Sequence, residues 1–468
     1  MKYISTRLES KSLTFKDVVL QGLADDGGLY VPEKLPKFST AQLEKMKSMS
    51  YQDLFFAVTK EFVNGEIDDE SYKEIIAKSY KDFNHGAIAP LKQLGGNEFL
   101  LELFHGPTLA FKDFALQFLG NLLDYLLKEN GEKIAIIGAT SGDTGSAAIE
   151  GCKKCESAEI FILHPYKRVS DVQRCQMTSV LAKNVHNIAL KGNFDDCQSF
   201  VKKMFVEQEF LKGRRMVAVN SINWARIMGQ IVYYFYCGLR LSEVNGVGTS
   251  FTVPTGNFGD IYAGFLAKRM GLNVERLIVA TNSNDILTRF INNNDYSKSE
   301  MIETISPSMN IQVSSNFERM LFNIHDDSGC KEELVKLIRN FDKTGSLKVE
   351  AKILDKIKSH FDAYAVNDQE TMKQITEIYK ESGEILDPHT AIGVLATRKY
   401  MASEKYNGEN VVSLATAHPA KFPDAVVESG APHPDLPKFL QGLFEREERY
   451  DILDNNLEVV KEYIAKRI

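Results

Sequence analysis

The sequence is poor in cysteine and tryptophan and has no long apolar run. Its 468 residues include six cysteines, one tryptophan and 13 prolines. Cysteines spread so thinly are typical of buried free thiols in a reducing compartment, and they exclude a small disulfide-stapled scaffold. The longest nearly unbroken apolar stretch, residues 231–239, is far shorter than the ~20 residues that cross a bilayer. We therefore expect no membrane span.

The sequence also lacks an excess of positive charge, an apolar leader and a paired metal motif. Its 56 Lys and Arg residues against 63 Asp and Glu residues give a net charge of −7, so we expect no nucleic-acid partner. Residues 1–7 lead into charged sequence without an apolar signal region, which favours a cytoplasmic location. Cys152 and Cys155 form a CxxC pair, but the two lysines between them and the lack of a second CxxC pair argue against a zinc site. We expect no metal site.

What the sequence does contain is a change of pattern near residue 99. Apolar residues at helical spacing in residues 40–80 predict several amphipathic helices. Beyond them, short apolar runs each precede a turn and a helical pattern, as in an α/β sheet with helical crossovers. The predicted strands are residues 133–137, 159–163, 185–190, 216–219, 250–253, 276–280 and 411–416. Residues 331–382 and the tail after residue 437 are predicted to be helical.

Lys112 is the first residue with an unusual chemical setting. It lies among apolar neighbours in residues 109–115. Loss of water around an amine disfavours its charged form and exposes a nucleophilic lone pair, as a Schiff-base lysine requires. The alternative is a lysine at a helix start that extends its amine past an apolar face to water.

Two glycine-containing turns each follow a predicted strand and precede a helix. In residues 136–148, backbone N–H groups with Ser141 and Thr144 would favour a carboxylate or phosphate, although simple N-capping is the alternative. Residues 251–264 repeat this design without a nucleotide P-loop ending or a dinucleotide glycine spacing, so a small cofactor phosphate fits better. One such lysine and two anion-binding turns describe a pyridoxal phosphate enzyme acting on an anionic amino acid.

Several segments of the sequence, taken together, resemble a known family. Residues 102–115 resemble the lysine signature of the fold-type II pyridoxal phosphate enzymes. Further segments are similar to threonine synthases of the longer bacterial and fungal type, namely residues 1–7, 22–33, 105–108, 141–145, 220–226, 256–259 and 386–391. The resemblance runs from the first residue to the terminal helices.

The resemblance implies an α/β fold with two open lobes, an added N-terminal helical domain and C-terminal helices. We expect residues 1–95 to form the helical domain and residues 121–220 the small α/β domain. Residues 96–120 and 221–430 would form the large cofactor-binding domain, and residues 431–468 a helical tail.

The resemblance also implies the roles of individual residues. Lys112 matches the lysine that holds the cofactor. Gly256, Asn257, Phe258 and Gly259 match the loop for the cofactor phosphate. Thr416 matches the hydroxyl residue at the pyridine nitrogen, with Ser413 as its rival, and only one of them can face the ring because they point to opposite faces of a strand. By analogy, the substrate is bound by Ser141, Gly142, Asp143, Thr144, Gly145, Asn220, Ser221, Asn223 and Arg226.

The implied reaction converts O-phospho-L-homoserine and water to L-threonine and phosphate with pyridoxal phosphate as cofactor. Two other fold-type II activities stay open, a threonine dehydratase and a phosphohomoserine lyase that releases a keto acid. Residues 1–33 argue against the dehydratase. A non-catalytic metabolite-binding protein is a further alternative, against which an intact Lys112 argues.

Overall fold

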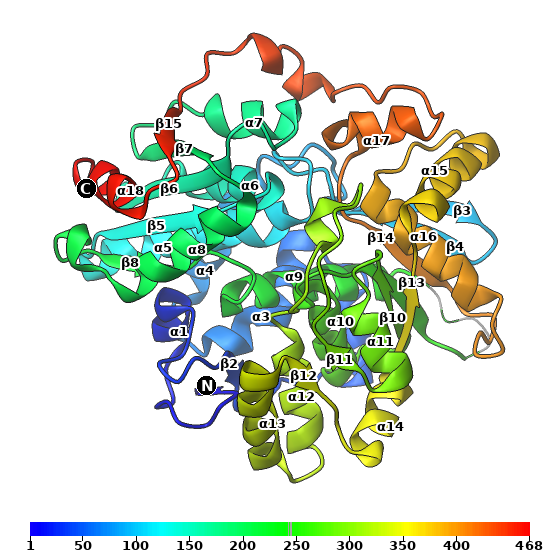
Figure 1. Ribbon diagram of the computed structural model, residues 1–468. Coiled ribbons are helices and arrows are strands. Elements are labelled where there is room, and N and C mark those ends of the chain that lie inside the picture. The colour runs from blue at the N-terminus through cyan, green and yellow to red at the C-terminus, as the bar shows by residue number, and fades with distance from the viewer. Residues whose placement is uncertain (242, 244–245) are drawn as a thin grey trace.

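Two sheets, each flanked by helices, organise the chain in the computed structural model (Figure 1), which describes residues 1–241, 243 and 246–468. The larger sheet has six strands, of which β3 alone runs antiparallel to its neighbour. In spatial order they are β13 (Phe361–Ala365), β10 (Val274–Thr281), β9 (Thr249–Pro254), β14 (Val411–Ala415), β4 (Glu98–Glu102) and β3 (Leu91–Gly95). Every residue of β9 and β14 is buried, as expected for central parallel strands covered on both faces.

The smaller sheet has five parallel strands. In spatial order they are β15 (Asp451–Asp454), β7 (Val185–Lys191), β6 (Ala158–Pro165), β5 (Ile134–Ala139) and β8 (Arg215–Val217). Figure 1 shows the two sheets on opposite sides of the molecule, with α9 (Trp224–Gly238) between them. All the strands predicted from apolar runs are confirmed, because each overlaps a strand of one of these sheets.

The N-terminal region packs as a helical layer. Its helices are α1 (Phe15–Gln21), α2 (Thr40–Met46), α3 (Tyr51–Val63) and α4 (Asp69–Tyr80), and β1 (Tyr3–Ser5) pairs antiparallel with β2 (Tyr30–Pro32). The side chain of Ser50 caps α3, whose apolar face is fully buried. The helices predicted within residues 40–80 are confirmed.

The remaining helices cover the sheets and connect them. They are α5 (Lys112–Asn130), α6 (Asp143–Cys152), α7 (Asp171–Thr178), α8 (Phe194–Val206), α9 (Trp224–Gly238), α10 (Gly259–Arg269), α11 (Ile286–Asn293), α12 (Phe317–Asp326), α13 (Lys331–Thr344), α14 (Ala351–His360), α15 (Asp368–Ser382), α16 (Pro388–Met401), α17 (Pro423–Glu428) and α18 (Leu457–Ala465). Helix α9 is buried along almost its whole length and packs against α3, α5 and α10. It therefore forms the centre of the core.

The structure differs from the sequence prediction in several strands. Strands β12 (Ser346–Leu347), which pairs with β11 (Tyr296–Ser297), and β13 lie in a region predicted to be helical. Strand β15 lies in a tail predicted to be helical, where α18 and two 3-10 turns accompany it. Strand β3 pairs with β4 of the large sheet, although its residues were assigned to the N-terminal domain. Strand β15 joins the small sheet, although its residues belong to the predicted tail. The proposed domain division stays a prediction.

No helix in the described residues combines the length and apolarity needed to cross a bilayer. The cytoplasmic location and the lack of a nucleic-acid partner stay predictions from the sequence.

Candidate active site

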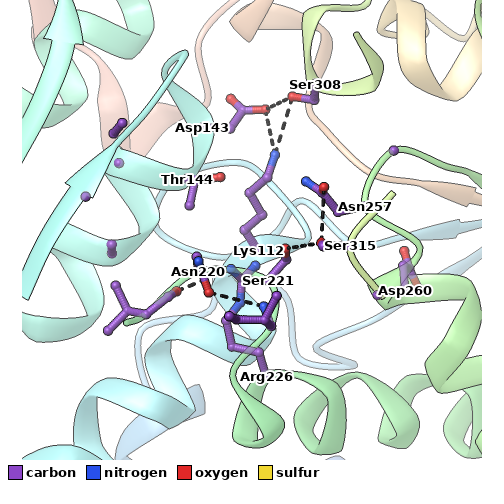
Figure 2. A pocket seen from close by; sticks show the side chains of 18 of the residues that line it. Lys112, Asp143, Thr144, Asn220, Ser221, Arg226, Asn257, Asp260, Ser308 and Ser315 are labelled. Carbon is purple, nitrogen blue, oxygen red and sulfur yellow. Dashed lines mark hydrogen bonds and ion pairs between the residues drawn. The ribbon is translucent and has the colours of Figure 1, made fainter. Parts of the chain in front are cut away.

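A cavity of about 500 Å³ lies at the carboxyl ends of strands from both sheets. The residues that follow β5, β9 and β14 line it, together with the start of α5 (Figure 2). In open α/β folds ligands bind outside the carboxyl ends of the strands, where loops and helix starts present their polar groups. The cavity is therefore the candidate active site.

Lys112 begins α5, and its side chain extends into the cavity. Its Nζ donates a hydrogen bond to Asp143 Oδ2 at 3.2 Å and lies 3.5 Å from Ser308 Oγ. Burial lowers the pKa of Lys112; the Asp143 carboxylate offsets part of this effect, and the positive charge of Lys421 adds to it. A lysine with a lowered pKa supplies a neutral amine more readily, as a nucleophile or a base requires.

Asp143, the first residue of α6, is buried among positive groups. Its Oδ1 accepts hydrogen bonds from Lys421 Nζ and Gln173 Nε2, both at 2.9 Å. Although burial alone raises the pKa of Asp143, the ammonium groups of Lys112 and Lys421 hold it well below its usual range. An ionised carboxylate repels another carboxylate, so Asp143 itself is poorly suited to the substrate-carboxylate role that the sequence suggested.

The rest of that turn divides into two groups. Thr144 and Gly145 line the cavity with Asp143, whereas Ser141 and Gly142 are not among the lining residues. A Cβ on Gly142 would lie 2.3 Å from the side chain of Gln173, so this glycine permits close packing against α7. Of the predicted turn, Thr144 and Gly145 therefore line the cavity beside Asp143, and their role in substrate binding stays a prediction.

The loop at the start of α10 fits a phosphate group. Gly256, Asn257, Phe258 and Gly259 all line the cavity. Phe258 has φ +60°, uncommon for a residue with a side chain, and no side chain caps the helix that follows. A Cβ on Gly256 would lie 2.7 Å from the carbonyl oxygen of Ser308. Uncapped N–H groups at a helix start bind anions, so these residues fit the phosphate of pyridoxal phosphate.

Thr416 and Ser413 differ in what their side chains meet. Thr416, directly after β14, lines the cavity. Ser413 is fully buried within β14, and its Oγ lies 2.7 Å from the Thr397 hydroxyl on α16. Of the two hydroxyl groups, that of Thr416 is thus placed to meet the pyridine ring, and this role stays a prediction.

The segment before α9 supplies a second polar wall. Asn220, Ser221 and Arg226 line the cavity. The Ser221 hydroxyl lies 3.3 Å from that of Ser315, which donates to Asn257 Oδ1 at 3.3 Å. These contacts join the second wall to the phosphate-binding loop (Figure 2).

Arg226 is buried, and none of the carboxylates that the structure describes is in hydrogen-bond contact with it. Its Nη1 donates to the Val219 carbonyl oxygen at 3.3 Å, while its Nε has no hydrogen-bond partner among the described residues. Burial lowers the pKa of Arg226 to about 10. A buried guanidinium with a spare donor favours a bound anion.

Asn223 does not belong to this wall, in contrast to the sequence prediction. It is fully buried, and its Nδ2 donates to the carbonyl oxygens of Val19 and Ala218 at 2.9 and 3.1 Å. Its Oδ1 accepts from the N–H of Ala225, so Asn223 caps α9. Its side chain stabilises the fold and does not line the cavity.

Sequence reasoning missed Lys421, Ser308 and His389. Ser308 and His389 line the cavity, and the N–H of Ser308 donates to His389 Nε2 at 3.2 Å. Asp387 Oδ1 lies 2.8 Å from His389 Nδ1, an arrangement that leaves Nε2 as the acceptor. Lys421 had a signal of the kind used for Lys112, because apolar residues flank it in the sequence.

Comparisons with known proteins identify the family. Three family models match in chain order: Threonine synthase N terminus at residues 2–80, Pyridoxal-phosphate dependent enzyme at residues 87–341, and Threonine synthase, C-terminal at residues 390–464. The threonine synthase of Pseudomonas aeruginosa is 54% identical over 100% of this chain and 98% of its own length. That of Saccharomyces cerevisiae is 43% identical over 91% of this chain and 88% of its own.

Solved structures agree with this result. The pyridoxal-phosphate-bound threonine synthase from Brucella melitensis superposes with a TM-score of 0.96 and 47% identity, over 100% of this chain and 99% of that one. The yeast enzyme gives a TM-score of 0.95 and 39% identity, over 100% and 98%. The predicted fold class and cofactor are therefore confirmed. This chain belongs to the threonine synthase family of fold-type II, pyridoxal-phosphate-dependent enzymes.

Proposed function

We propose that this protein converts O-phospho-L-homoserine and water to L-threonine and phosphate. The observation that carries this proposal is the pairing of two features in one cavity. Lys112 presents a buried amine there, and Arg226 presents a buried guanidinium with a spare donor. A dianionic leaving group fits Arg226, and an amine with a lowered pKa fits proton transfer.

The cofactor would be held from three directions. Lys112 would bond to it, residues 256–259 would bind its phosphate through backbone N–H groups, and Thr416 would meet its pyridine nitrogen. When bound, pyridoxal phosphate withdraws electrons from the carbon atoms next to the substrate's amino group. A hydroxyl group, unlike a carboxylate, does not stabilise a protonated ring, so Thr416 would restrain transamination.

Lys112 would carry the protons of the reaction. In the cofactor-loaded enzyme its Nζ would accept the proton from Cα and, after passing that proton on, the proton from Cβ. Phosphate would leave Cγ and take up one of these protons, and the other would be returned at Cγ. Water would add its hydroxyl group at Cβ and supply the proton that returns to Cα, which gives L-threonine. Because Lys112 is the first residue of α5, the helix would hold the amine on one side of the bound substrate, within reach of these neighbouring carbons.

Arg226, with Asn220 and Ser221, would bind the γ-phosphate of the substrate. Binding there compensates the charge of the leaving group as it departs, which favours phosphate over hydroxide as leaving group. Unphosphorylated homoserine would leave the buried guanidinium unpaired, so the site should discriminate against it.

The test is to incubate the purified protein separately with O-phosphohomoserine, homoserine and threonine, and to measure phosphate, threonine and 2-oxobutanoate. We expect phosphate and threonine in equal amounts from O-phosphohomoserine and no product from homoserine. Keto acid from threonine at a matching rate would identify a dehydratase instead. Phosphate with keto acid but without threonine would identify the lyase, and binding without product a non-catalytic protein.

A further inference from the structure

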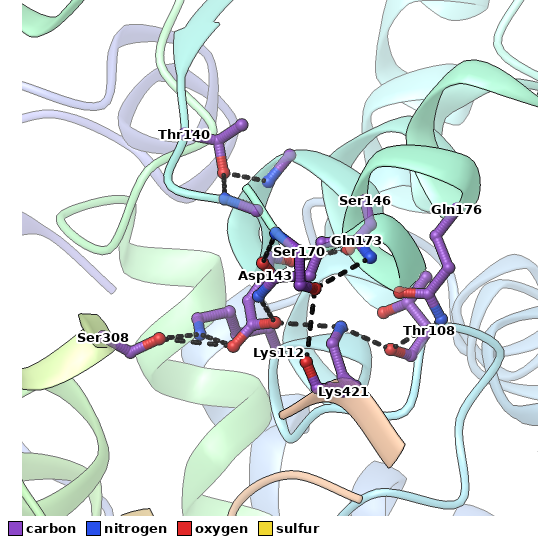
Figure 3. A network of polar contacts seen from close by, with 12 residues as sticks. Thr108, Lys112, Thr140, Asp143, Ser146, Ser170, Gln173, Gln176, Ser308 and Lys421 are labelled. Atoms are coloured by element: carbon purple, nitrogen blue, oxygen red, sulfur yellow. Dashed lines mark hydrogen bonds and ion pairs between the residues drawn. The ribbon is translucent and has the colours of Figure 1, made fainter. Parts of the chain in front are cut away.

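Lys421 is a second buried lysine beside the site that the reaction scheme does not use. It ends a 3-10 turn, Pro419–Lys421, a few residues after β14, and its side chain is fully buried. Its Nζ lies 2.9 Å from Asp143 Oδ1 and donates to the Thr108 carbonyl oxygen at 2.7 Å (Figure 3). The ammonium group is thus fixed by partners from two segments.

Asp143 is shared between two lysines. Its Oδ2 faces Lys112 Nζ at 3.2 Å and its Oδ1 faces Lys421 Nζ at 2.9 Å, while Gln173 and Ser308 donate to it as neutral partners. Figure 3 shows the two ammonium groups on either side of the carboxylate. One negative charge therefore faces two positive charges in a buried site, which leaves a net positive charge when both lysines are protonated.

The charged groups that act on Lys112 come from three elements. Asp143 lies on α6, Lys421 on the turn after β14, and Arg226 on α9. His389, which accepts the N–H of Ser308, is a further titratable group on the cavity wall. Lys421 and Arg226 make the Lys112 ammonium less stable, and Asp143 makes it more stable. The protonation of Lys112 therefore depends on the balance within this set.

We propose that Lys421 is a positioning residue that neutralises and orients Asp143, and thereby makes the Lys112 amine release its proton more easily. If Lys421 is absent, the whole charge of Asp143 acts on Lys112 and retains its proton. If Asp143 is neutral, Lys421 acts on Lys112 as an uncompensated positive charge and expels the proton. The two substitutions should therefore have opposite effects on the same amine.

The proposal rests on the proposed function in one respect, that Lys112 bonds to the cofactor. The test therefore uses a step that needs no substrate. Formation of the bond with the aldehyde of pyridoxal phosphate requires the neutral amine. The rate at which the full-length, cofactor-free protein takes up pyridoxal phosphate, followed by visible absorbance over a pH series, reports the titration of Lys112. The pH profile of kcat with O-phosphohomoserine is the second readout.

The variants are Lys421→Gln, Asp143→Asn and the double variant. For Lys421→Gln, which keeps a donor but loses the charge, we expect the midpoint of the uptake profile to rise by about one pH unit or more. For Asp143→Asn we expect it to fall by a similar amount. The double variant removes one charge of each sign, so its midpoint should return to within about 0.5 unit of the parent's. Lys421→Arg, which keeps the charge, should also stay near the parent.

Lys405→Gln is the matched control, because Lys405 pairs with the buried Asp362 on β13 and lies outside the cavity lining. We expect its midpoint to equal the parent's. Shifts of the same sign for Lys421→Gln and Asp143→Asn, or no shift for Lys421→Gln, would overturn the proposal and leave Lys421 a structural residue. If Lys421→Gln does not fold, the midpoints of Asp143→Asn and of the double variant are compared instead. Asp143→Asn should lie below the parent, and the further loss of Lys421 in the double variant should raise the midpoint again. Absence of threonine production would overturn the proposed function while the uptake profiles still stand.

Discussion

Replacement of Arg226 by methionine should make the protein more stable and less active. The parent must keep a guanidinium in a buried position with one hydrogen bond, to the Val219 carbonyl oxygen. The pKa of about 10 compares with an ordinary arginine value above about 12, and one pKa unit corresponds to about 1.4 kcal/mol, so the charge costs roughly 3 kcal/mol. The lost hydrogen bond offsets about 1 kcal/mol. We expect the free energy of unfolding to rise by about 1–2 kcal/mol.

The same substitution should weaken turnover of the phosphorylated substrate. A charge-assisted hydrogen bond to a phosphate is worth about 2–3 kcal/mol, which corresponds to a loss of roughly 30- to 150-fold in kcat/KM. Phosphate release from O-phosphohomoserine measures this loss, and denaturant unfolding of the same preparation, freed of cofactor, measures stability. A gain in stability together with a loss of activity would distinguish an arginine that binds an anion from one that stabilises the fold.

Arg319 on α12 provides the matched control for stability. It is equally buried, but its nitrogens donate to the Tyr30 and Ile222 carbonyl oxygens and to Asn316 Oδ1. Burial lowers the pKa of Arg319 to about 10 as well, so its charge carries a similar cost. Arg319→Met would nevertheless remove three charge-assisted hydrogen bonds and leave their acceptors unpaired, which outweighs that cost, so we expect a net loss of about 2–4 kcal/mol of stability. If Arg226→Met destabilises the protein as much as Arg319→Met and leaves kcat/KM unchanged, the assignment of Arg226 to the substrate phosphate is refuted.

Three further substitutions test the remaining assignments. Lys112→Ala should abolish the visible absorbance of the bound cofactor and nearly all turnover, and a fully active variant would show that another residue does this work. Gly256→Val should weaken cofactor retention in dialysis, because even a Cβ would lie 2.7 Å from the Ser308 carbonyl oxygen; unchanged retention would mean that the loop is misassigned. Thr416→Asp should increase transamination relative to threonine formation, since a carboxylate stabilises a protonated ring. An equal effect from Ser413→Asp alone would contradict the choice of Thr416.

The strands that the sequence revealed are those with continuous apolar runs. Buried parallel strands need such runs, and β5, β6 and β10 have them. Strand β13 carries Asp362 in its second position, where Arg276 and Lys405 pair with the carboxylate. It also follows α14 without a break, so neither composition nor a turn signal marked it. Partners distant in the sequence make this segment a strand.

Prediction of the site residues from the sequence is limited in the same way. Lys112 and residues 256–259 could be recognised because local sequence sets both their conformation and their chemistry. Asn223 and Arg226 lie three residues apart at one helix start, and sequence alone does not tell a capping side chain from one that lines a cavity. Lys421 contacts the carbonyl oxygen of Thr108, which lies 313 residues earlier in the chain, so its position beside the site can be recognised only from the folded structure.

The order of the large sheet has a consequence for how the protein is made. Strand β14 lies between β9 and β4 and hydrogen-bonds to both, yet it is the last strand of that sheet along the chain. While residues 411–415 are still unsynthesised, β4 and β9 each present an unpaired edge, and such edges recruit strands from other chains. From the synthesis of β10 until that of β14, the nascent protein therefore has two incomplete half-sheets, a state in which chaperone protection matters most. Thr416 emerges directly after the strand that joins them, so the large sheet is completed together with the residue that we predict to meet the cofactor ring.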